Sequence, residues 1–244
     1  MDRNHKNRRP ICGKIRMNVK WKAPSPEVCM DFLFYSHLAI VLALSFALAR
    51  YGSAWVERLY GKFPDILTFP DKIRERGRYR PYLLGILFLL CGVRYVFMAS
   101  GIPLLFMLYL SALLLLMTMT DFEQYCLFDE MMIPLALGGM ALTAYVPSAF
   151  FDHVLASLAG GVLFLIIAIL SRGALGGGDV KLIACLGLWF GTDSLLFICM
   201  TGIILGGLSA LVMLVLKIKK RKSSFAYGPY FALTALALIL LRGL

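Results

Sequence analysis

The chain has 244 residues, of which 60% are apolar and only 16% charged, and its mean hydropathy is +0.78. A soluble domain is typically about 25% charged and 45–50% apolar, so this composition excludes a soluble enzyme and a disordered chain. The net charge of +11 would usually suggest nucleic-acid binding. Because apolar runs separate the basic clusters, we interpret the charge as the cytoplasmic bias of a membrane protein. We therefore expect the lipid bilayer, and no nucleic acid, as a partner.

A basic tail precedes the first apolar run. Residues 1–30 hold eight Lys and Arg residues, and a basic tail resists export across a membrane. Two interpretations stay open. Either the tail is not part of the native chain, with Met17 or Met30 as the start, or the tail is real and the charge bias downstream outweighs it.

Several apolar runs are long enough to cross a bilayer, which takes about 20 helical residues. The candidate spans are 32–50, 81–99, 102–120, 131–150, 153–171 and 226–243. The run 182–216 is too long for one span, and we divide it in two with a turn near Asp193 or slightly later. The sequence therefore predicts an all-α polytopic membrane protein with about eight transmembrane helices, or seven if 182–192 only dips into the membrane.

The charges between the spans predict an orientation. With eight spans, the basic segments 50–80 and 217–222 lie on one side of the membrane, together with the loops 121–130 and 172–181. The loops near residues 100, 150 and 193 on the other side contain no Lys or Arg. By the positive-inside rule, the first side is cytoplasmic.

Two acids fall at the same depth on that side. Asp121 follows the apolar run 113–120 at the inner end of the third span, and Asp179 comes just before the sixth. Either acid alone could be a solvated interfacial residue or a helix cap. A pair of carboxylates that meet can share one proton, so that one activates a water and the other polarises a peptide carbonyl. The pair therefore predicts aspartyl-protease chemistry, and the glycines before Asp179 would let a substrate backbone approach closely.

The residues around these acids resemble a known family, the type IV prepilin peptidases, which are polytopic aspartyl proteases. Their motif Gly-x-Gly-Asp-x-Lys is similar to residues 176–181, Gly-Gly-Gly-Asp-Val-Lys. Their first motif is an Asp followed about six residues later by Ile-Pro-Asp or Ile-Pro-Asn. Here Asp121 is followed by Leu-Phe-Asp at 127–129, so Phe128 stands where proline is usual. Weaker similarities lie in residues 52–59 and 78–81. The resemblance covers about residues 45–243.

The resemblance implies a membrane aspartyl endopeptidase that removes the basic leader of type IV prepilins or pseudopilins at the cytoplasmic face of a prokaryotic inner membrane. Asp121 and Asp179 would be the catalytic pair, supported by Gly176, Gly178 and Lys181, with no cofactor for proteolysis. Lys181 could tune the charge of Asp179 or meet lipid phosphate. Residues 81–244 would form the peptidase domain, after a first transmembrane helix and basic loop in 31–80.

The chain departs from the family pattern at two places. Many bacterial members bind zinc through two Cys-x-x-Cys pairs in the first cytoplasmic loop, but residues 51–80 contain no cysteine, so we expect no metal site. Many also have a Glu linked to amino-methylation where this chain has Leu84. That difference leaves methyl transfer from S-adenosylmethionine in doubt.

The loop 121–130 is the only acidic loop on the predicted cytoplasmic side. Besides Asp121 it holds Glu123, Asp129 and Glu130, which we interpret as a docking surface for a basic leader; a solvated turn is the alternative. Two other functions stay open for the whole chain. One is a non-catalytic membrane subunit of a pilus or secretion machine, and the other is a small transporter with a relay of acids across both leaflets.

Overall fold

The computed structural model describes residues 26–170, 175–216 and 227–244, and within these ranges the chain forms helices and no strand. The predicted basic tail up to residue 25 and the basic run 217–222 lie outside the described residues. The α-helices are α1 (Pro26–Ala47), α2 (Ser53–Lys62), α3 (Ile73–Arg76), α4 (Arg80–Val96), α5 (Ile102–Gln124), α6 (Asp129–Tyr145), α7 (Phe150–Leu170), α8 (Gly177–Val215) and α9 (Gly228–Arg242). A π-helical turn, η1 (Leu48–Gly52), joins α1 to α2, and the short 3₁₀ turns are η2 (Pro64–Ile66), η3 (Pro70–Lys72), η4 (Gly77–Tyr79) and η5 (Pro147–Ala149).

The prediction of an all-α polytopic membrane protein is confirmed. Among the described residues, five helical segments are long and apolar enough to cross a membrane: Leu33–Lys62, Pro70–Val96, Ile102–Gln124, Pro147–Leu170 and Gly177–Val215. The helix α9 is apolar but shorter than these. Since the predicted eight spans include such shorter helices and divide α8 in two, the number of spans stays a prediction.

A kink divides α8, close to the turn predicted near Asp193. Gly191 has φ 68° and ψ −175° within the helix, a conformation that a residue without a Cβ adopts readily. Asp152, at the start of α7, accepts hydrogen bonds there from the backbone N–H of Thr192 (3.1 Å) and from its hydroxyl (2.6 Å). The turn therefore comes slightly earlier than predicted, where glycine permits the backbone and Asp152 satisfies the next helical N–H.

The first predicted span is longer than its apolar run. Instead of ending near residue 50, the helix continues through η1 into α2 and ends at Lys62, so the first part of the predicted loop 51–80 is helical. The sequence of α2 is too polar to read as a span, but it buries Val56, Leu59 and Tyr60 on one side. Burial of this amphipathic face explains why the helix extends beyond the apolar residues.

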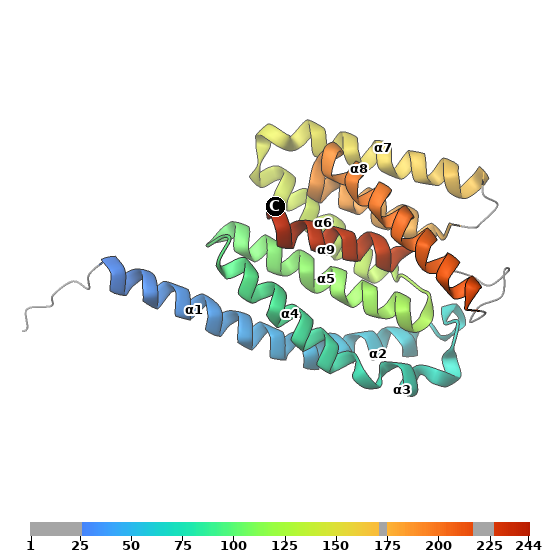
Figure 1. Cartoon of the computed structure of the whole chain (residues 1–244), viewed down its shortest axis with the longest axis horizontal. Coiled ribbons are helices and arrows are strands. Elements are labelled where there is room, and N and C mark those ends of the chain that lie inside the picture. Colours follow the sequence, from blue (N-terminus) through green and yellow to red (C-terminus); the bar gives the residue numbers. More distant parts are fainter. Residues whose placement is uncertain (1–25, 171–174, 217–226) are drawn as a thin grey trace, which may run out of the picture.

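The helix α5 is the centre of the bundle (Figure 1). Sixteen of its 23 residues are buried, whereas α7 buries three of 21, namely Ala156, Gly160 and Phe164. In Figure 1, α9 lies beside α5, with α1 and α4 on one side and α7 and α8 on the other, and α1 projects beyond the bundle. An all-round apolar helix is expected either in a core or in lipid, and α5 and α7 illustrate the two cases.

Candidate active site

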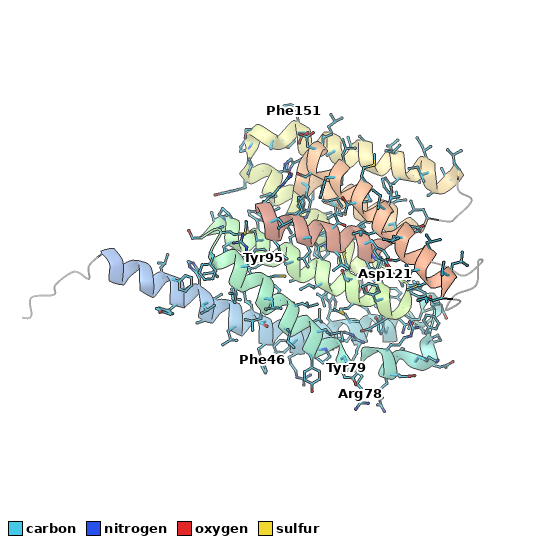
Figure 2. The ribbon with its side chains drawn as sticks, viewed as in Figure 1. Phe46, Arg78, Tyr79, Tyr95, Asp121 and Phe151 are labelled. Carbon is cyan, nitrogen blue, oxygen red and sulfur yellow. The ribbon has the colours of Figure 1, made fainter. Side chains whose placement is uncertain are left out.

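The two predicted acids lie together at one end of the bundle. Asp121 is in the last turn of α5 and Asp179 in the first turn of α8, and their residues are only 3% and 7% exposed. Figure 2 shows Asp121 near the ends of α8 and α9. The backbone N–H of Asp179 donates to the carbonyl of Gly176 at 3.1 Å, which begins the helix at the predicted motif. The sequence therefore placed both acids at the correct end of their helices.

A third element, α9, brings a glycine against both carboxylates. A Cβ added to Gly228 would lie 3.0 Å from Oδ1 of Asp179 and still closer to Oδ2 of Asp121. The Asp179 carboxylate interacts with the backbone N–H groups of Gly228 and Gly176. Only a residue without a side chain allows the backbone of α9 to lie this close to both carboxylates. The two acids thus converge on one backbone position, which the sequence interpretation missed because it treated 226–243 only as an apolar span.

The two carboxylates differ in their surroundings. Oδ2 of Asp121 is buried and has no hydrogen-bond partner among the described residues, whereas Asp179 has the two backbone N–H groups. A buried polar atom without a partner is rare and calls for an explanation. An oxygen of this kind, facing another carboxylate, is suited to carry a proton that the pair shares.

The glycines of the predicted motif also lie at this centre. A Cβ on Gly178 would approach the Cβ of Leu127 to 3.0 Å, and a Cβ on Gly176 would approach Oδ2 of Asp179 to 3.4 Å. The start of α8 therefore packs tightly against the segment between α5 and α6. A side chain at residue 178 would push the two acid-bearing elements apart.

Glu123, which was predicted to be part of the docking surface, is buried. Its side chain is 8% exposed and forms a bidentate ion pair with Arg80, whose side chain is 1% exposed. Arg80 donates from Nε to Oε1 at 2.9 Å and from Nη2 to Oε2 at 2.8 Å. The hydroxyl of Tyr60 also donates to Oε2, at 2.9 Å. Counting charges only within 121–130 missed these partners because they come from α4 and α2.

The other two predicted docking acids are at the surface and are paired. Asp129 forms an ion pair with Lys181 at 2.6 Å, with side-chain exposures of 68% and 55% respectively. Glu130 pairs with Lys62. Lys181, which was expected to tune the charge of Asp179 or to meet lipid phosphate, has its ammonium against Asp129 on α6. The two pairs connect the start of α6 to α8 and to α2.

Phe128, at the position where proline was expected from the resemblance, is buried just before α6. It is 3% exposed, and its ring centroid lies 5.8 Å from that of Tyr60 and 6.1 Å from that of Phe63. An aromatic residue here buries a large apolar surface against α2. Phe128 therefore forms part of the packing between α2 and the loop that follows α5.

A thiol mechanism is disfavoured at this end of the bundle. Cys126, between α5 and α6, is the thiol nearest Asp121 in sequence, and burial with the charges of Asp121 and Asp129 raises its pKa to about 11. The thiolate is the nucleophilic form. His153 hydrogen-bonds Leu188 near the kink of α8, at the opposite end. Among the described residues there is no group of three His, Cys, Asp or Glu that could hold a metal.

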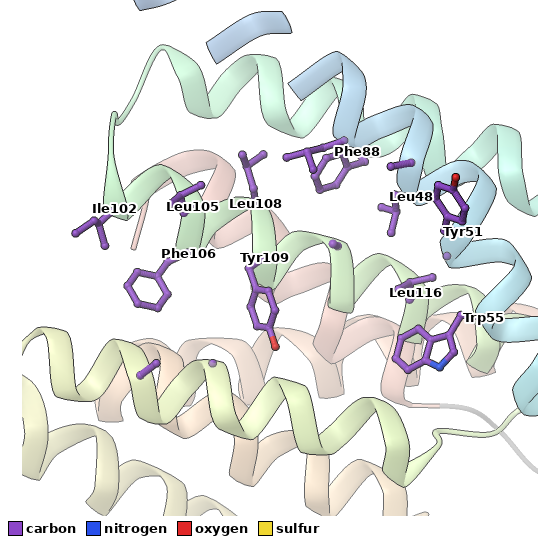
Figure 3. Close-up of a pocket in the computed structure, with 16 residues that line it drawn as sticks. Leu48, Tyr51, Trp55, Phe88, Ile102, Leu105, Phe106, Leu108, Tyr109 and Leu116 are labelled. Carbon is purple, nitrogen blue, oxygen red and sulfur yellow. The ribbon is translucent and has the colours of Figure 1, made fainter. Parts of the chain in front are cut away.

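A separate apolar groove of about 810 Å³ lies along α5 (Figure 3). Its walls come from α1, η1, α2, α4 and α6, and its floor on α5 includes Leu105, Tyr109 and Leu116. Successive helical residues turn by about 100°, so Asp121 points about 140° away from Leu116. The groove therefore opens on a different face of α5 from the one that carries the acid.

Comparison with known proteins shows which family this region is similar to. The model of the type IV leader peptidase family matches residues 108–211, which include both acids. This part of the chain is therefore similar to the type IV leader peptidase family. The family match covers α5 to most of α8, and α9 with Gly228 lies just outside it.

Curated relatives of this leader peptidase region carry one name, prepilin leader peptidase/N-methyltransferase. The Klebsiella pneumoniae protein is 37% identical over 119 residues, which cover 46% of this chain and 50% of the relative. The Neisseria gonorrhoeae protein is 33% identical over 130 residues (50% and 43%), and the Aeromonas salmonicida protein is 28% identical over 134 residues (52% and 45%). The match thus spans about half the length of these relatives. No solved structure matches the chain.

Proposed function

We propose that the chain is a membrane aspartyl endopeptidase that removes the basic leader of type IV prepilins or pseudopilins, with Asp121 and Asp179 as its catalytic pair. The observation that carries this proposal is the convergence on Gly228 of two carboxylates that both come from the region matched by the family model. The names of the relatives supply the substrate class. The proposal covers peptide cleavage alone, because Leu84 stands where many members of the family have the Glu linked to amino-methylation.

The proposed mechanism uses one proton shared by the pair. Asp179, which the two backbone N–H groups stabilise as a carboxylate, removes a proton from a water held between the acids. Asp121 carries the shared proton on Oδ2 and donates a hydrogen bond to the scissile carbonyl, which the water attacks. The proton taken by Asp179 then passes to the leaving amine, and the pair returns to its starting state without a covalent intermediate.

We propose that this end of the bundle faces the cytoplasm of the inner membrane. The starts of α4, α6, α8 and α9 meet the end of α5 there, as does the segment 50–80, which carries eight Lys and Arg residues. The positive-inside rule favours the cytoplasm for such a segment. In this orientation a basic leader stays in the cytosol, and water reaches the acids from that side.

The burial of acids favours a peptidase over a transporter. Among the described residues, the buried carboxylates are Asp121, Glu123 and Asp179, and all three lie at one end of the bundle. A relay across both leaflets would need functional acids along the depth of the bilayer. Asp152, at the other end, is exposed and caps the helix after the kink.

Co-expression with a prepilin tests the proposal in cells. In a host that lacks a leader peptidase of its own, the wild-type chain should convert the prepilin to a shorter mature form, which a gel resolves. A double Asp121→Asn/Asp179→Asn variant, expressed to the same membrane level, should leave the prepilin uncut. Uncut prepilin with the wild-type chain would instead favour the non-catalytic subunit.

We also propose that Asp129 and Glu130 receive the basic leader, exchanging Lys181 and Lys62 for its Lys and Arg residues. Exposed ion pairs are individually weak, so the two acids together should contribute about 1 kcal/mol, or about fivefold in apparent affinity. An Asp129→Asn/Glu130→Gln variant should raise KM about fivefold for a basic leader and leave kcat unchanged, as expected for lost uniform binding.

Salt and leader charge provide the controls for this docking prediction. The increase in KM should shrink at 1 M salt, where the Debye length is about 3 Å, and should be absent for a leader whose Lys and Arg are replaced by Gln. An unchanged KM for the basic leader would mean that Asp129 and Glu130 only tie α6 to its neighbours.

Cleavage should require no metal ion. Segment 51–80 contains neither Cys nor His, and an aspartyl pair activates water without a Lewis acid. Dialysis of the purified protein against a chelator should therefore leave the cleavage rate within about twofold of the untreated protein. Loss of activity that added zinc restores would contradict the proposed chemistry.

A further inference from the structure

The segment from α2 to α4 holds the end of α5 that carries Asp121. Its strongest tie is the buried bidentate pair between Arg80 and Glu123, to which Tyr60 adds a third hydrogen bond. Arg80 also donates from Nη1 to the carbonyl of Ser53 at 3.0 Å, so that one guanidinium connects α2, α4 and α5. Arg suits this role because its planar group fixes the direction of two parallel hydrogen bonds.

A second set of ties reaches the last backbone groups of α5. Arg76 donates from Nη1 to the carbonyl of Glu123 at 2.7 Å and lies over the ring of Phe69, 3.8 Å from its centroid. The last carbonyls of a helix have no intrahelical partner, and a cation there also complements the helix dipole. The side chain of Gln124 exchanges two hydrogen bonds with the backbone of Phe69, at 2.9 and 3.2 Å.

These hydrogen bonds and ion pairs hold α5 on the side opposite the acid pair. Glu123 follows Asp121 by two residues and therefore points about 200° away from it around the helix. The backbone N–H of Tyr125, which has a left-handed conformation (φ 52°, ψ 40°), donates to the carbonyl of Asp121 at 2.9 Å and closes the helix. Any rotation of this last turn would move Asp121 away from Gly228 and Asp179.

We infer that Arg80, Glu123 and Arg76 are positioning residues, which fix the last turn of α5 so that Asp121 meets Asp179 across Gly228. This inference rests on the proposed function. A buried ion pair contributes little net stability compared with an apolar replacement of similar size. What the pair adds here is a fixed direction for the end of the helix, and catalysis depends steeply on that direction, because a displacement of about 1 Å can cost about 10²-fold in rate.

An apolar replacement of the whole cluster separates positioning from stability. Glu123→Gln alone would leave Arg80 buried without its counter-charge and could fail to fold. A Tyr60→Phe/Arg80→Met/Glu123→Leu variant removes both buried charges and the dependent hydroxyl together, so it should fold and unfold at a temperature close to that of the wild type. We expect its kcat on a prepilin to fall about 10²-fold with KM nearly unchanged. A folded triple variant with wild-type kcat would overturn the inference.

Arg76 allows a milder test with a matched control. Arg76→Ala removes the guanidinium from the end of α5 without leaving a buried charge, and Arg74→Ala removes an equal charge from an exposed residue of the same helix. We expect Arg76→Ala to lower kcat, Arg76→Lys to restore part of it because Lys also donates to helix carbonyls, and Arg74→Ala to resemble the wild type. Equal kcat values in Arg76→Ala and Arg74→Ala would contradict the role of Arg76.

Hydrogen exchange of the end of α5 gives a measurement that does not depend on cleavage. Amides 121–125 should exchange at least several-fold faster in the triple variant than in the wild type, while those of α7 stay unchanged. Unchanged exchange at 121–125 would overturn the inference whatever the activity. If the wild type cleaves no prepilin, the proposed function fails, and this exchange still decides whether the cluster holds the helix end.

Discussion

Asp121→Asn and Asp179→Asn should each lower the rate of leader cleavage by about 10²–10⁴-fold or more, the usual contribution of general acid–base catalysis. Either change removes a group that must hold or accept a proton, and neither changes the size of the side chain. KM should change little, because the mutated oxygens act on the reacting bond more than on the leader. Single-turnover cleavage of a purified prepilin in detergent measures the effect.

Asp152→Asn is the matched control for this prediction. It makes the same chemical change at the opposite end of the bundle, where Asp152 only caps the helix after the kink. This variant should cleave at the wild-type rate. Substantial cleavage by either variant of the pair, at equal amounts of folded protein, would mean that the two acids are not one catalytic centre.

Gly228→Ala should lower the rate of leader cleavage nearly as much as the Asp→Asn changes, although it removes no functional group. The added methyl would lie 3.0 Å from Oδ1 of Asp179 and closer to Oδ2 of Asp121, so it would occupy the approach between the two carboxylates. A shift of about 1 Å in the acids costs about 10²-fold, and we expect at least that loss in kcat. The measurement is kcat at saturating prepilin, with the melting temperature recorded beside it.

The matched control for Gly228 is Gly207→Ala in the second half of α8. A Cβ at Gly207 would meet no atom within 4 Å, and alanine is favoured over glycine in a helix interior. This variant should be as stable as the wild type or more so, and fully active. Equal activity of the two alanine variants would exclude Gly228 from the active site.

The sequence predicted the acid pair because the pair depends on topology and on a local motif. Apolar runs set the spans, and the spans placed Asp121 and Asp179 at the same end of the bundle. The motif at 176–181 then lies where α8 begins. Two observed boundaries differ from their predicted positions because of local effects. The first span extends to the end of α2 because α2 has an amphipathic face, and α8 kinks at Gly191 because glycine permits the backbone conformation found there.

Long-range partners could not be predicted in this way. Arg80 and Glu123 are 43 positions apart in sequence, and charge counting within each loop treated the first as part of a basic segment and the second as a free acid. Gly228 stands 49 positions after Asp179, and its only sequence signal was a Gly-Pro pair at the start of an apolar run. Both features depend on which helix ends meet, which hydropathy alone does not determine.

The most direct measurement of the central claim is cleavage of a purified prepilin by the purified full chain, with the cut site read by mass spectrometry. We predict one cut, directly after the basic leader, that resists inhibitors of serine, cysteine and metal-dependent proteases and disappears in both Asp121→Asn and Asp179→Asn. An intact prepilin after prolonged incubation with folded wild-type protein, or a cut that survives in either variant, would contradict the account.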